Sequence, residues 1–261
     1  MTEIYFSSGT ILGYALTGAI CILVPFLLAF LWRRCTGESW LIFIVGVVTY
    51  YIVGTVRIMA RMLMFGEDSF LRSDKLIYCF SQALLSGVLE EVGRYIAFRY
   101  PLKNRTARTV SVMYGLGHDA FESFAVGGIM SLEYVSYALT CNSKGIGVFL
   151  AGLDEEEAAD MLESFATLAD HSFLNSLLVD ADMIAGTLFH VAMSVIVFMA
   201  VRTEDWKRWL LTAIGIHTLM DMRQYLEVIG LGMDGARVLN IVLTGFICWY
   251  CYRLYKKLPY V

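Results

Sequence analysis

Two adjacent glutamates and an arginine lie inside an apolar segment of this chain. Glu90, Glu91 and Arg94 belong to the stretch SGVLEEVGRYIAFRY at residues 86–100. An ionisable side chain at the centre of a bilayer costs roughly 3 kcal/mol or more, so it usually faces a bundle interior or a wet cavity. A glutamate in partly apolar surroundings can act as a general base. We therefore interpret Glu90 as a candidate base, with Glu91 and Arg94 supporting it.

Other ionisable residues interrupt the apolar segments at a regular spacing. The stretches GLGHDAFES, GTLFHVAMS and GIHTLMDM supply His118, Asp119, Glu122, His190, His217 and Asp221. Four positions separate Glu90 from Arg94, His118 from Glu122, and His217 from Asp221. Such pairs lie on one face of a helix. One pair of this kind could simply neutralise a charge, but three pairs together with His190 favour a shared site.

The depth of these groups in their segments also indicates one site. With a rise of about 1.5 Å per residue, Glu90, His118, His190 and His217 each lie roughly 13 to 17 Å from one end of an apolar segment. Half the thickness of a bilayer's hydrocarbon core is about 15 Å. Four consecutive segments therefore place a polar group close to the middle of the membrane.

The residue types in this set suit a hydrolytic site, in which the histidines could either hold a zinc ion or orient a water directly. Imidazole nitrogens and a carboxylate oxygen bind zinc, and a catalytic zinc keeps one position open for water. The expected ligands are His118, His190, His217 and Glu122. Zinc lowers the pKa of its bound water, and Glu90 could accept the proton. The resulting hypothesis is hydrolysis inside the membrane.

The elements that must position these groups are membrane helices. The chain has 261 residues, of which 58% are apolar and 17% charged, whereas soluble domains carry about 25% charged residues. A run of about 20 apolar residues can cross a bilayer as a helix. Seven such runs cover residues 10–32, 40–63, 76–100, 109–139, 182–201, 208–228 and 236–255. The sequence therefore predicts an all-α, polytopic membrane helix bundle of about seven transmembrane helices.

The basic residues predict the orientation of this bundle. Most Lys and Arg residues follow the first, third and fifth runs or lie in the C-terminal tail. Because cytoplasmic loops are enriched in Lys and Arg, we expect the N-terminus out and the C-terminus in. The net charge of −4 and the lack of a basic, aromatic stripe argue against nucleic acid. We expect the protein to lie in a cell membrane, the bacterial plasma membrane, with several passes across it. Its expected partner is the lipid bilayer.

Residues 1–261 are expected to form a single integral membrane domain with a long outer connection at about 140–181. This connection is acidic, and Asp154 with Glu157 could form a capping box at the start of a helix. Its apolar face would contain Met161, Leu162, Phe165 and Leu168. Two interpretations stay open for this amphipathic helix. It could lie on the outer membrane interface, or it could act as a lid or gather substrate.

The remaining polar residues of the segments receive structural interpretations. Arg57 lies about two turns deep in the second run, and we expect it to pair with a carboxylate or a lipid phosphate. The six cysteines give no disulfide framework, because no two obvious partners share the oxidising side. Cys248 and Cys251 form a C-x-x-C, but inside a membrane helix this spacing is better explained by packing.

Together these motifs resemble a known family. Glu-Glu-x-x-Arg at 90–94, GLGHDAFES at 115–123, the isolated histidine at 190 and His-x-x-x-Asp at 217–221 are similar to the YhfC family of intramembrane metalloproteases. That family is related to the CAAX-prenyl endopeptidases and bacterial CPBP proteins, to PrsW proteases and to the gamma-secretase scaffold subunit. The spacing from the diacid to the arginine is one residue shorter than in the CAAX-type relatives, which favours the YhfC branch.

The resemblance implies roles for matched positions. Glu90 would activate water, and Glu91 and Arg94 would complete the diacidic motif. His118 and His217 would supply the histidines of the second and last motifs, and His190 would match a further one. Asp221 would take the position that is often Asn or Asp, as part of the catalytic group.

Three classes of function follow from the site and the resemblance. The favoured class is an intramembrane endopeptidase that hydrolyses a membrane-embedded or membrane-proximal peptide bond of a membrane protein or peptide. The second is a non-catalytic scaffold or chaperone subunit, which has less need of the diacid. The third is a proton-coupled transporter, but such proteins often contain inverted repeats, and the sequence contains no detectable duplication.

Overall fold

All regular secondary structure in the residues that the structure describes is helical. The structure is a computed structural model that describes residues 4–66 and 69–259, and no strand occurs in these ranges. The elements are α1 (Ser8–Thr36), α2 (Trp40–Met64), the 3₁₀ turn η1 (Phe70–Arg72), α3 (Lys75–Arg99), α4 (Thr109–Glu122), the π-helix η2 (Ser123–Gly128), α5 (Ile129–Lys144), α6 (Gly147–Leu150), α7 (Glu155–Ala169), α8 (Phe173–Arg202), α9 (Trp206–Asp221), α10 (Arg223–Val228) and α11 (Gly232–Tyr255). The predicted all-α class is confirmed.

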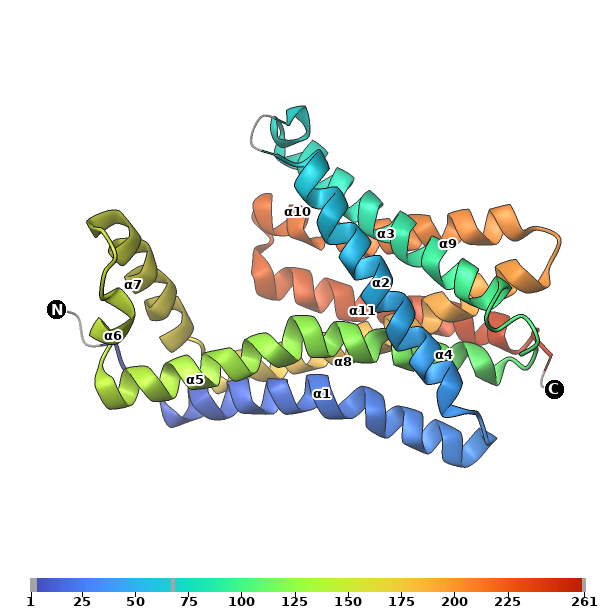
Figure 1. The fold of residues 1–261 in the computed structure, drawn as a ribbon, viewed down its shortest axis with the longest axis horizontal. Helices are drawn as coiled ribbons and strands as arrows, with labels where there is room; N and C mark the ends of the chain where they lie inside the picture. The colour runs from blue at the N-terminus through green and yellow to red at the C-terminus, as the bar shows by residue number, and fades with distance from the viewer. Residues whose placement is uncertain (1–3, 67–68, 260–261) are drawn as a thin grey trace.

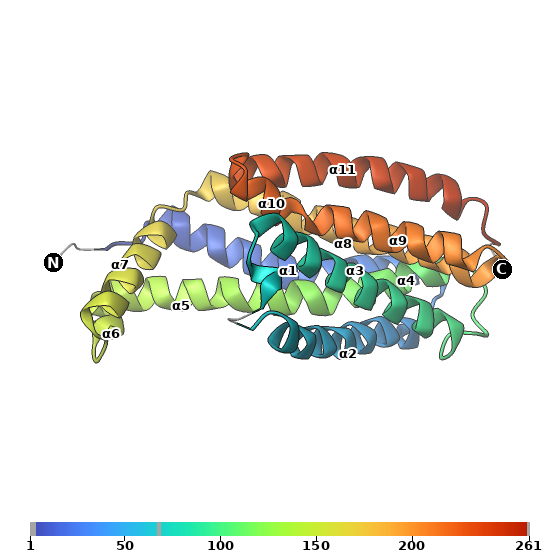
Figure 2. The same cartoon turned by 90° about the horizontal axis from the view of Figure 1, so that it is seen from above.

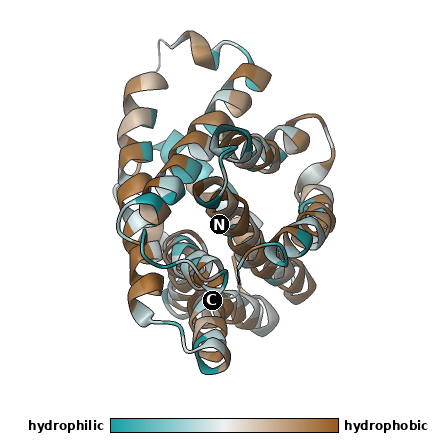
Figure 3. Ribbon diagram, turned by 90° about the vertical axis from the view of Figure 1, so that its right-hand side faces the viewer, coloured by the Kyte–Doolittle hydropathy of each residue, from teal (hydrophilic) through white to brown (hydrophobic). Residues whose placement is uncertain are grey.

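Five helical segments are long and apolar enough to cross a membrane. They are α1, α2, the continuous segment α4–η2–α5, α8 and α11. The segment α3 carries the charges of the site, and α9 has 16 residues. Hydrophobic residues dominate the helices while many of the connections are hydrophilic (Figure 3), as the polytopic membrane bundle requires. Six of the seven predicted runs fall on continuous helical segments, whereas the run 208–228 is divided between α9 and α10 by a turn at Met222. The count of seven spans and the orientation stay predictions.

Polar residues at the helix starts explain where several helices begin. The first N–H groups of a helix have no partner within the helix. The side chain of Ser7 accepts from the N–H of Thr10, and that of Asp74 accepts from the first turn of α3. Asp154 and Glu157 form the predicted capping box at the start of α7. These caps fix the register in which α1, α3 and α7 present their side chains.

The helices α4 and α8 lie at the centre of the bundle (Figures 1 and 2). The apolar window of α8 is 72% buried, against at most 28% in the other four apolar segments. Two glycines let α4 approach its neighbours closely. A Cβ at Gly117 would lie 2.0 Å from the carbonyl oxygen of Phe43 in α2, and one at Gly115 would lie 2.7 Å from the Cα of Val191 in α8. The same close packing places His118 between α2 and α8.

A second, smaller core lies at the end of the bundle that carries α6 and α7, which we name the α7 end (Figure 1). It contains Phe6, Ala138, Cys141, Ile146 and Phe165, and Met161, Leu162 and Leu168 of α7 pack against it. The predicted apolar face of α7 is thus directed at least partly toward protein, with Phe165 only 4% exposed. Whether α7 lies on the membrane interface or acts as a lid stays open.

Candidate active site

The eight site residues singled out from the sequence meet in the middle of the bundle. The helix α3 supplies Glu90, Glu91 and Arg94, α4 supplies His118 and Glu122, α8 supplies His190, and α9 supplies His217 and Asp221. Six of these side chains are at most 8% exposed, while those of Glu122 and Asp221 are 25% and 39% exposed. The similar depths in four segments therefore correspond to a spatial cluster in the structure.

The two carboxylate oxygens of Glu90 have different surroundings. Its Oε1 accepts a hydrogen bond from Arg57 Nη1 at 2.6 Å and another from Ser86 Oγ at 3.1 Å. Arg57 is itself held by the hydroxyl of Tyr50, 2.9 Å from Nη2. The expectation that Arg57 pairs with a carboxylate is therefore met by Glu90. One oxygen of the expected base is fixed, which leaves the other to do chemistry.

The second oxygen of Glu90, Oε2, is directed toward the histidines. It lies 3.3 Å from His118 Nε2, 3.7 Å from His217 Nε2 and 3.8 Å from Arg94 Nη2. The Glu90 side chain is 1% exposed. A buried carboxylate is tolerated only with partners that offset its lost hydration. His118, His217 and Arg94 are such partners for Oε2, but their contacts to it are longer than those that Arg57 and Ser86 make to Oε1.

Glu91 and Arg94 fix the orientation of two histidines. Glu91 Oε1 lies 2.6 Å from His217 Nδ1, and Glu91 Oε2 lies 3.2 Å from Arg94 Nε. Arg94 also donates to the backbone oxygen of His190 at 3.0 Å and to Ser194 Oγ at 2.8 Å, and its Nη2 lies 2.8 Å from His190 Nδ1. Because a guanidinium can only donate, His190 Nδ1 must accept, and the hydrogen of the neutral ring lies on Nε2.

Four of the side chains lie close enough together to share one metal ion. One donor atom from each of Glu90, His118, Glu122 and His190 lies within 4.8 Å of the others. Two imidazoles and two carboxylates are donor types that suit zinc. Glu122 Oε2 lies 2.8 Å from His190 Nε2, yet it is buried without a properly aligned hydrogen bond among the described residues. A cation between these donors would satisfy that oxygen, so the cluster fits the metal that the sequence predicted.

The sequence-based ligand set and the geometric cluster differ in one member. His217 was expected as a ligand, but its Nδ1 bonds Glu91 and its Nε2 lies 3.7 Å from Glu90 Oε2, outside the four-residue cluster. Glu90 takes its place in the cluster. Asp221 lies 3.8 Å from His217 Nε2. The ligand role of His217 and the catalytic role of Asp221 stay predictions.

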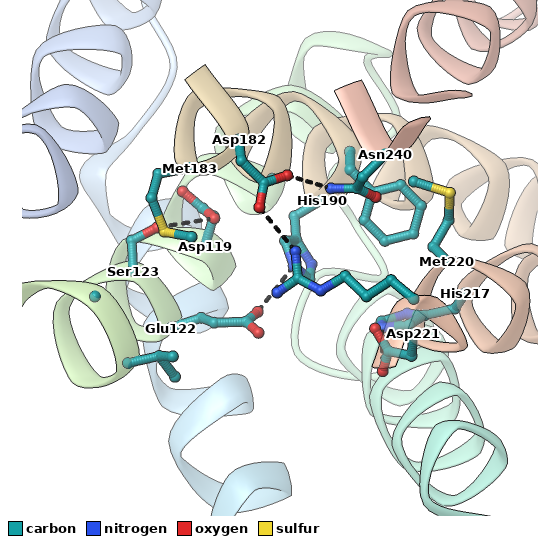
Figure 4. A pocket seen from close by; sticks show the side chains of 15 residues that line it. Asp119, Glu122, Ser123, Asp182, Met183, His190, His217, Met220, Asp221 and Asn240 are labelled. Carbon is teal, nitrogen blue, oxygen red and sulfur yellow. Dashed lines mark hydrogen bonds and ion pairs between the residues drawn. The ribbon is translucent and has the colours of Figure 1, made fainter. Parts of the chain in front are cut away.

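A cavity of about 110 Å³ opens beside the cluster. Its walls include Glu122, His190, His217 and Asp221, which are drawn in Figure 4. The volume admits several water molecules, since a buried water needs about 15 Å³ of such space. We name it the site cavity. Water and a substrate group can therefore reach the same donors that could hold a metal.

Sequence analysis did not single out a second polar group on the wall of the site cavity. Asp182 of α8 accepts from Arg223 Nη1 at 2.9 Å and from Asn240 Nδ2 at 2.6 Å, and all three residues line the cavity. Arg223 is a charged residue inside the predicted run 208–228, a signal that could have found it. Asp182 and Asn240 are 58 positions apart, so no local spacing connects them.

The π-helix η2 begins directly after Glu122. The sequence predicts one uninterrupted helical run over 109–139, whereas the structure contains a π-helical turn over Ser123–Gly128 between α4 and α5. Single π-turns inside α-helices occur frequently at functional sites. The wider turn also brings Gly127 against α1, where a Cβ would lie 2.4 Å from Cys21 Sγ. The irregular turn thus adjoins the residue whose carboxylate faces the cluster.

Comparisons with known proteins identify the family to which this sequence is similar. Residues 20–243 match the family model described as YhfC intramembrane metalloprotease. The chain is 25% identical over 240 residues to the uncharacterized membrane protein YhfC of Bacillus subtilis (strain 168), an alignment that covers 90% of this chain and 92% of that protein. No solved structure gives a significant match.

Proposed function

Because the chain belongs to the YhfC intramembrane metalloprotease family, we propose that it is an endopeptidase that hydrolyses a peptide bond within the membrane or close to it. The observation that carries the proposal is the buried cluster of Glu90, His118, Glu122 and His190, with donor atoms within 4.8 Å of one another. The site cavity beside it admits water. A hydrolase needs both features in one place.

We propose that His118, His190 and Glu122 would hold a zinc ion. Two histidines and a glutamate, with the fourth position left for water, are a known ligand set of catalytic zinc. A bound zinc would lower the pKa of that water and polarise a substrate carbonyl. Ligation by His190 through Nε2 would release the hydrogen that Arg94 directs to that nitrogen.

In this proposal Glu90 is the general base. Arg57 and Ser86 hold its Oε1, so Oε2 is the oxygen that accepts the proton of the attacking water. The water oxygen then bonds to the carbonyl carbon of the peptide. As the carbon–nitrogen bond breaks, Glu90 returns the proton to the leaving amine nitrogen. No proton is gained or lost by the protein over the cycle.

The remaining members act through these groups. Arg94 orients His190 by its bonds to the ring and to the backbone oxygen of that residue. Glu91 accepts the Nδ1 hydrogen of His217, which leaves His217 Nε2 directed toward Glu90 and Asp221. We propose that Glu91 and Arg94 are positioning residues and that Asp221 keeps His217 in place at the cavity wall. Such supporting bonds are a common requirement of metal and acid–base sites.

The experiment that tests the proposal is the substitution Glu90→Gln. Glutamine keeps the size of the side chain but does not accept a proton at neutral pH, so cleavage should fall by at least about a hundredfold. Glu133→Gln, an exposed change of the same kind on α5, is the matched control. Purified proteins are reconstituted with reporter peptides that contain one transmembrane segment, and soluble fragments are measured. Full cleavage by a folded Glu90→Gln protein would contradict the role of Glu90 as general base, and absence of cleavage by the unaltered protein would favour the scaffold function.

Metal analysis tests the ligand set. His118→Ala and His190→Ala should each lower the zinc bound per chain, whereas His171→Ala should not, because His171 lies outside the cluster. His217→Ala separates the two possible sets, since only the set expected from the sequence includes it. Zinc binding should also release protons, which calorimetry in buffers of different ionisation enthalpy detects. Active protein without stoichiometric metal that resists chelators would contradict the zinc part of the proposal.

A further inference from the structure

An ordered ion pair lies between the site cavity and the α7 end. Arg223, the first residue of α10, donates to Asp182 Oδ2 at 2.9 Å, and Asn240 of α11 donates to Asp182 Oδ1 at 2.6 Å. The Asp182 side chain is 2% exposed, whereas that of Arg223 is 41% exposed. Three helices thus build one buried carboxylate and one accessible guanidinium that it holds in place.

Most of the donors of Arg223 are available to a ligand. A guanidinium carries five N–H groups, and within the described residues only Nη1 of Arg223 has a partner. A planar guanidinium that is already oriented can bind a carboxylate through two parallel hydrogen bonds. Asp182 cannot easily leave, because Asn240 holds its second oxygen. Arg223 is therefore a preformed donor for an anionic group.

Arg223 lines two adjoining cavities of opposite charge. The site cavity has Asp119, Glu122, Asp182 and Asp221 in its walls and Arg223 as its one Lys or Arg among the described lining residues. A cavity of about 560 Å³ on the other side has Lys75, Arg223 and Arg237 in its walls and Asp182 as its one described acid. We name it the basic cavity. A third cavity of about 770 Å³ toward α7 also includes Arg223 and Arg237.

We propose that the basic cavity binds an acidic side chain of the peptide substrate, with Arg223 as the residue that recognises its carboxylate. The inference rests on the proposed endopeptidase function and adds a substrate class, a polypeptide with Asp or Glu on the α7 side of the cleaved bond. A lipid phosphate has the same charge. The peptide is favoured because Arg223 also lines the site cavity, so a chain held there continues directly to the Glu/His cluster.

The charges of the two cavities support this direction of binding. An acidic side chain would be repelled by the carboxylates of the site cavity and attracted by Lys75 and Arg223 of the basic cavity, whose third cation, Arg237, is paired with Asp234 at 2.8 Å. The neutral peptide bond, which carries no such charge, can enter the site cavity. Repulsion of the acidic side chain from the site cavity and its attraction to the basic cavity would therefore both align the substrate.

Binding to an inactive protein tests the proposal without cleavage. The probes are synthetic peptides with one apolar transmembrane segment that differ only in carrying Glu, Gln or Lys at one position, which is scanned along the flank at the α7 end. The protein is Glu90→Gln in nanodiscs of neutral phosphatidylcholine, and fluorescence anisotropy reports affinity. At one or two positions the Glu peptide should bind at least about tenfold more tightly than the Gln peptide, the low end for a charged hydrogen bond.

Substitutions at the pair assign this preference to Arg223. Arg223→Gln with Asp182→Asn removes both charges, so no unpaired buried carboxylate remains, and it should bind the Glu and Gln peptides equally. Arg223→Lys keeps the charge and should retain part of the preference. Arg61→Gln, an exposed change of the same kind that lines none of these cavities, should keep all of it. A Glu preference that survives the double change would overturn the proposal.

Two further arms separate the alternatives. If equal binding of the Glu and Gln peptides is accompanied by Arg223-dependent retention of phosphatidylglycerol, the cavity is a lipid site and the proposal is wrong. Cleavage of the same peptides by protein with Glu90 intact is measured separately. Absence of cleavage would contradict the proposed function while the binding ratio still decides the role of Arg223, and cleavage without any Glu preference would contradict only the role of Arg223.

Discussion

Two arginine–carboxylate networks near the site differ in how completely their donors are used. In the deep network around Glu90, Arg94 is fully buried and bonds Glu91, His190 and Ser194. At the cavity wall, Arg223 is 41% exposed and contacts Asp182 through one nitrogen. A buried charge must be fully paired because it has lost its hydration, whereas a half-exposed one keeps part of it. The deep network can therefore fix the geometry of a site, and the shallow one retains donors for a ligand.

The largest expected effect comes from removing one charge of the deep network. Arg94→Met should lower the free energy of unfolding by about 3 to 5 kcal/mol, because Glu91 is left buried without its cation. Arg223→Met should cost less, about 1 to 3 kcal/mol, because Asn240 still donates to the Asp182 carboxylate that stays buried. Equilibrium unfolding of both variants in mixed detergent micelles measures the difference.

A double variant checks the cause of that difference. Arg94→Met combined with Glu91→Gln removes both members of the pair and should recover part of the loss, because no unpaired buried charge remains. Equal losses for Arg94→Met and Arg223→Met would show that depth and pairing do not distinguish the two networks.

The next largest effect concerns Arg57, which joins the deep network from α2. Arg57→Gln should lower the maximal rate of cleavage by about tenfold or more, because a 1 Å shift of a catalytic group can cost about a hundredfold. Ser86 still bonds Glu90, so the protein should stay folded. Arg57→Lys restores the charge, but a single ammonium cannot serve both Glu90 and Tyr50 in the same geometry.

The readout for Arg57 is the separation of rate from substrate affinity. A positioning role lowers the maximal rate and leaves the half-saturating concentration of the reporter peptide nearly unchanged. A drop in folded protein that accounts for all the lost rate would instead assign Arg57 to stability alone.

The sequence predicted the helices and the convergence of the site because both depend on local or periodic features. Apolar runs of suitable length fall on helices, and the pair Asp154 and Glu157 caps α7 as its spacing predicts. Equal depth in four segments was enough to bring Glu90 and the histidines together. Arg57 was expected to pair with a carboxylate or a lipid phosphate, since a charge at that depth requires a partner, and the carboxylate is the one found.

Features set by helix rotation and by distant contacts could not be predicted in this way. Depth along a helix does not say which ring nitrogen faces which oxygen, so the sequence did not predict that Glu90, and not His217, belongs to the four-residue cluster. The π-turn after Glu122 has no clear sequence signal. The pair of Arg223 and Asp182 joins positions 41 apart, and the packing of α11 against both α8 and α10 brings them together.

A smaller effect tests whether the cavity wall has the free space that the deep network lacks. Gly186 lines the site cavity, and a Cβ there would meet no atom within 4 Å. Gly186→Ala should therefore raise the free energy of unfolding by roughly 0.5 to 1 kcal/mol, the usual gain from removing a helical glycine. Gly117→Ala, next to His118, should destabilise the protein, because its Cβ would lie 2.0 Å from a backbone oxygen.

Enlarging the side chain at Gly186 turns the same space into a test of access. Gly186→Leu should keep the fold and slow cleavage, because it occupies room that substrate and water use. If both alanine variants change stability by the same amount and sign, the contrast between the packed interior and the open wall is not supported.

The smallest effect is expected at the α7 end, where His171 follows α7. Its ring stacks on Tyr14 at a centroid distance of 5.1 Å, and its Nε2 lies 3.1 Å from Ser176 Oγ. Burial lowers the pKa of His171, and the nearby Arg237 lowers it further while Asp234 acts in the opposite sense. The folded protein therefore favours the neutral ring, and the unfolded chain binds the proton more readily. The stability that this residue contributes is complete above its ordinary pKa of about 6.5 and declines as the pH falls toward the lowered value.

Lowering the pH from about 7 to 5.5 across that pKa should speed hydrogen exchange in α7, measured by mass spectrometry of peptides that cover Glu155–Ala169. His171→Phe keeps an aromatic ring against Tyr14 but does not titrate, so its α7 should exchange at a rate that changes less over this range. An identical pH response in both proteins would place the sensitivity in other groups of the α7 end.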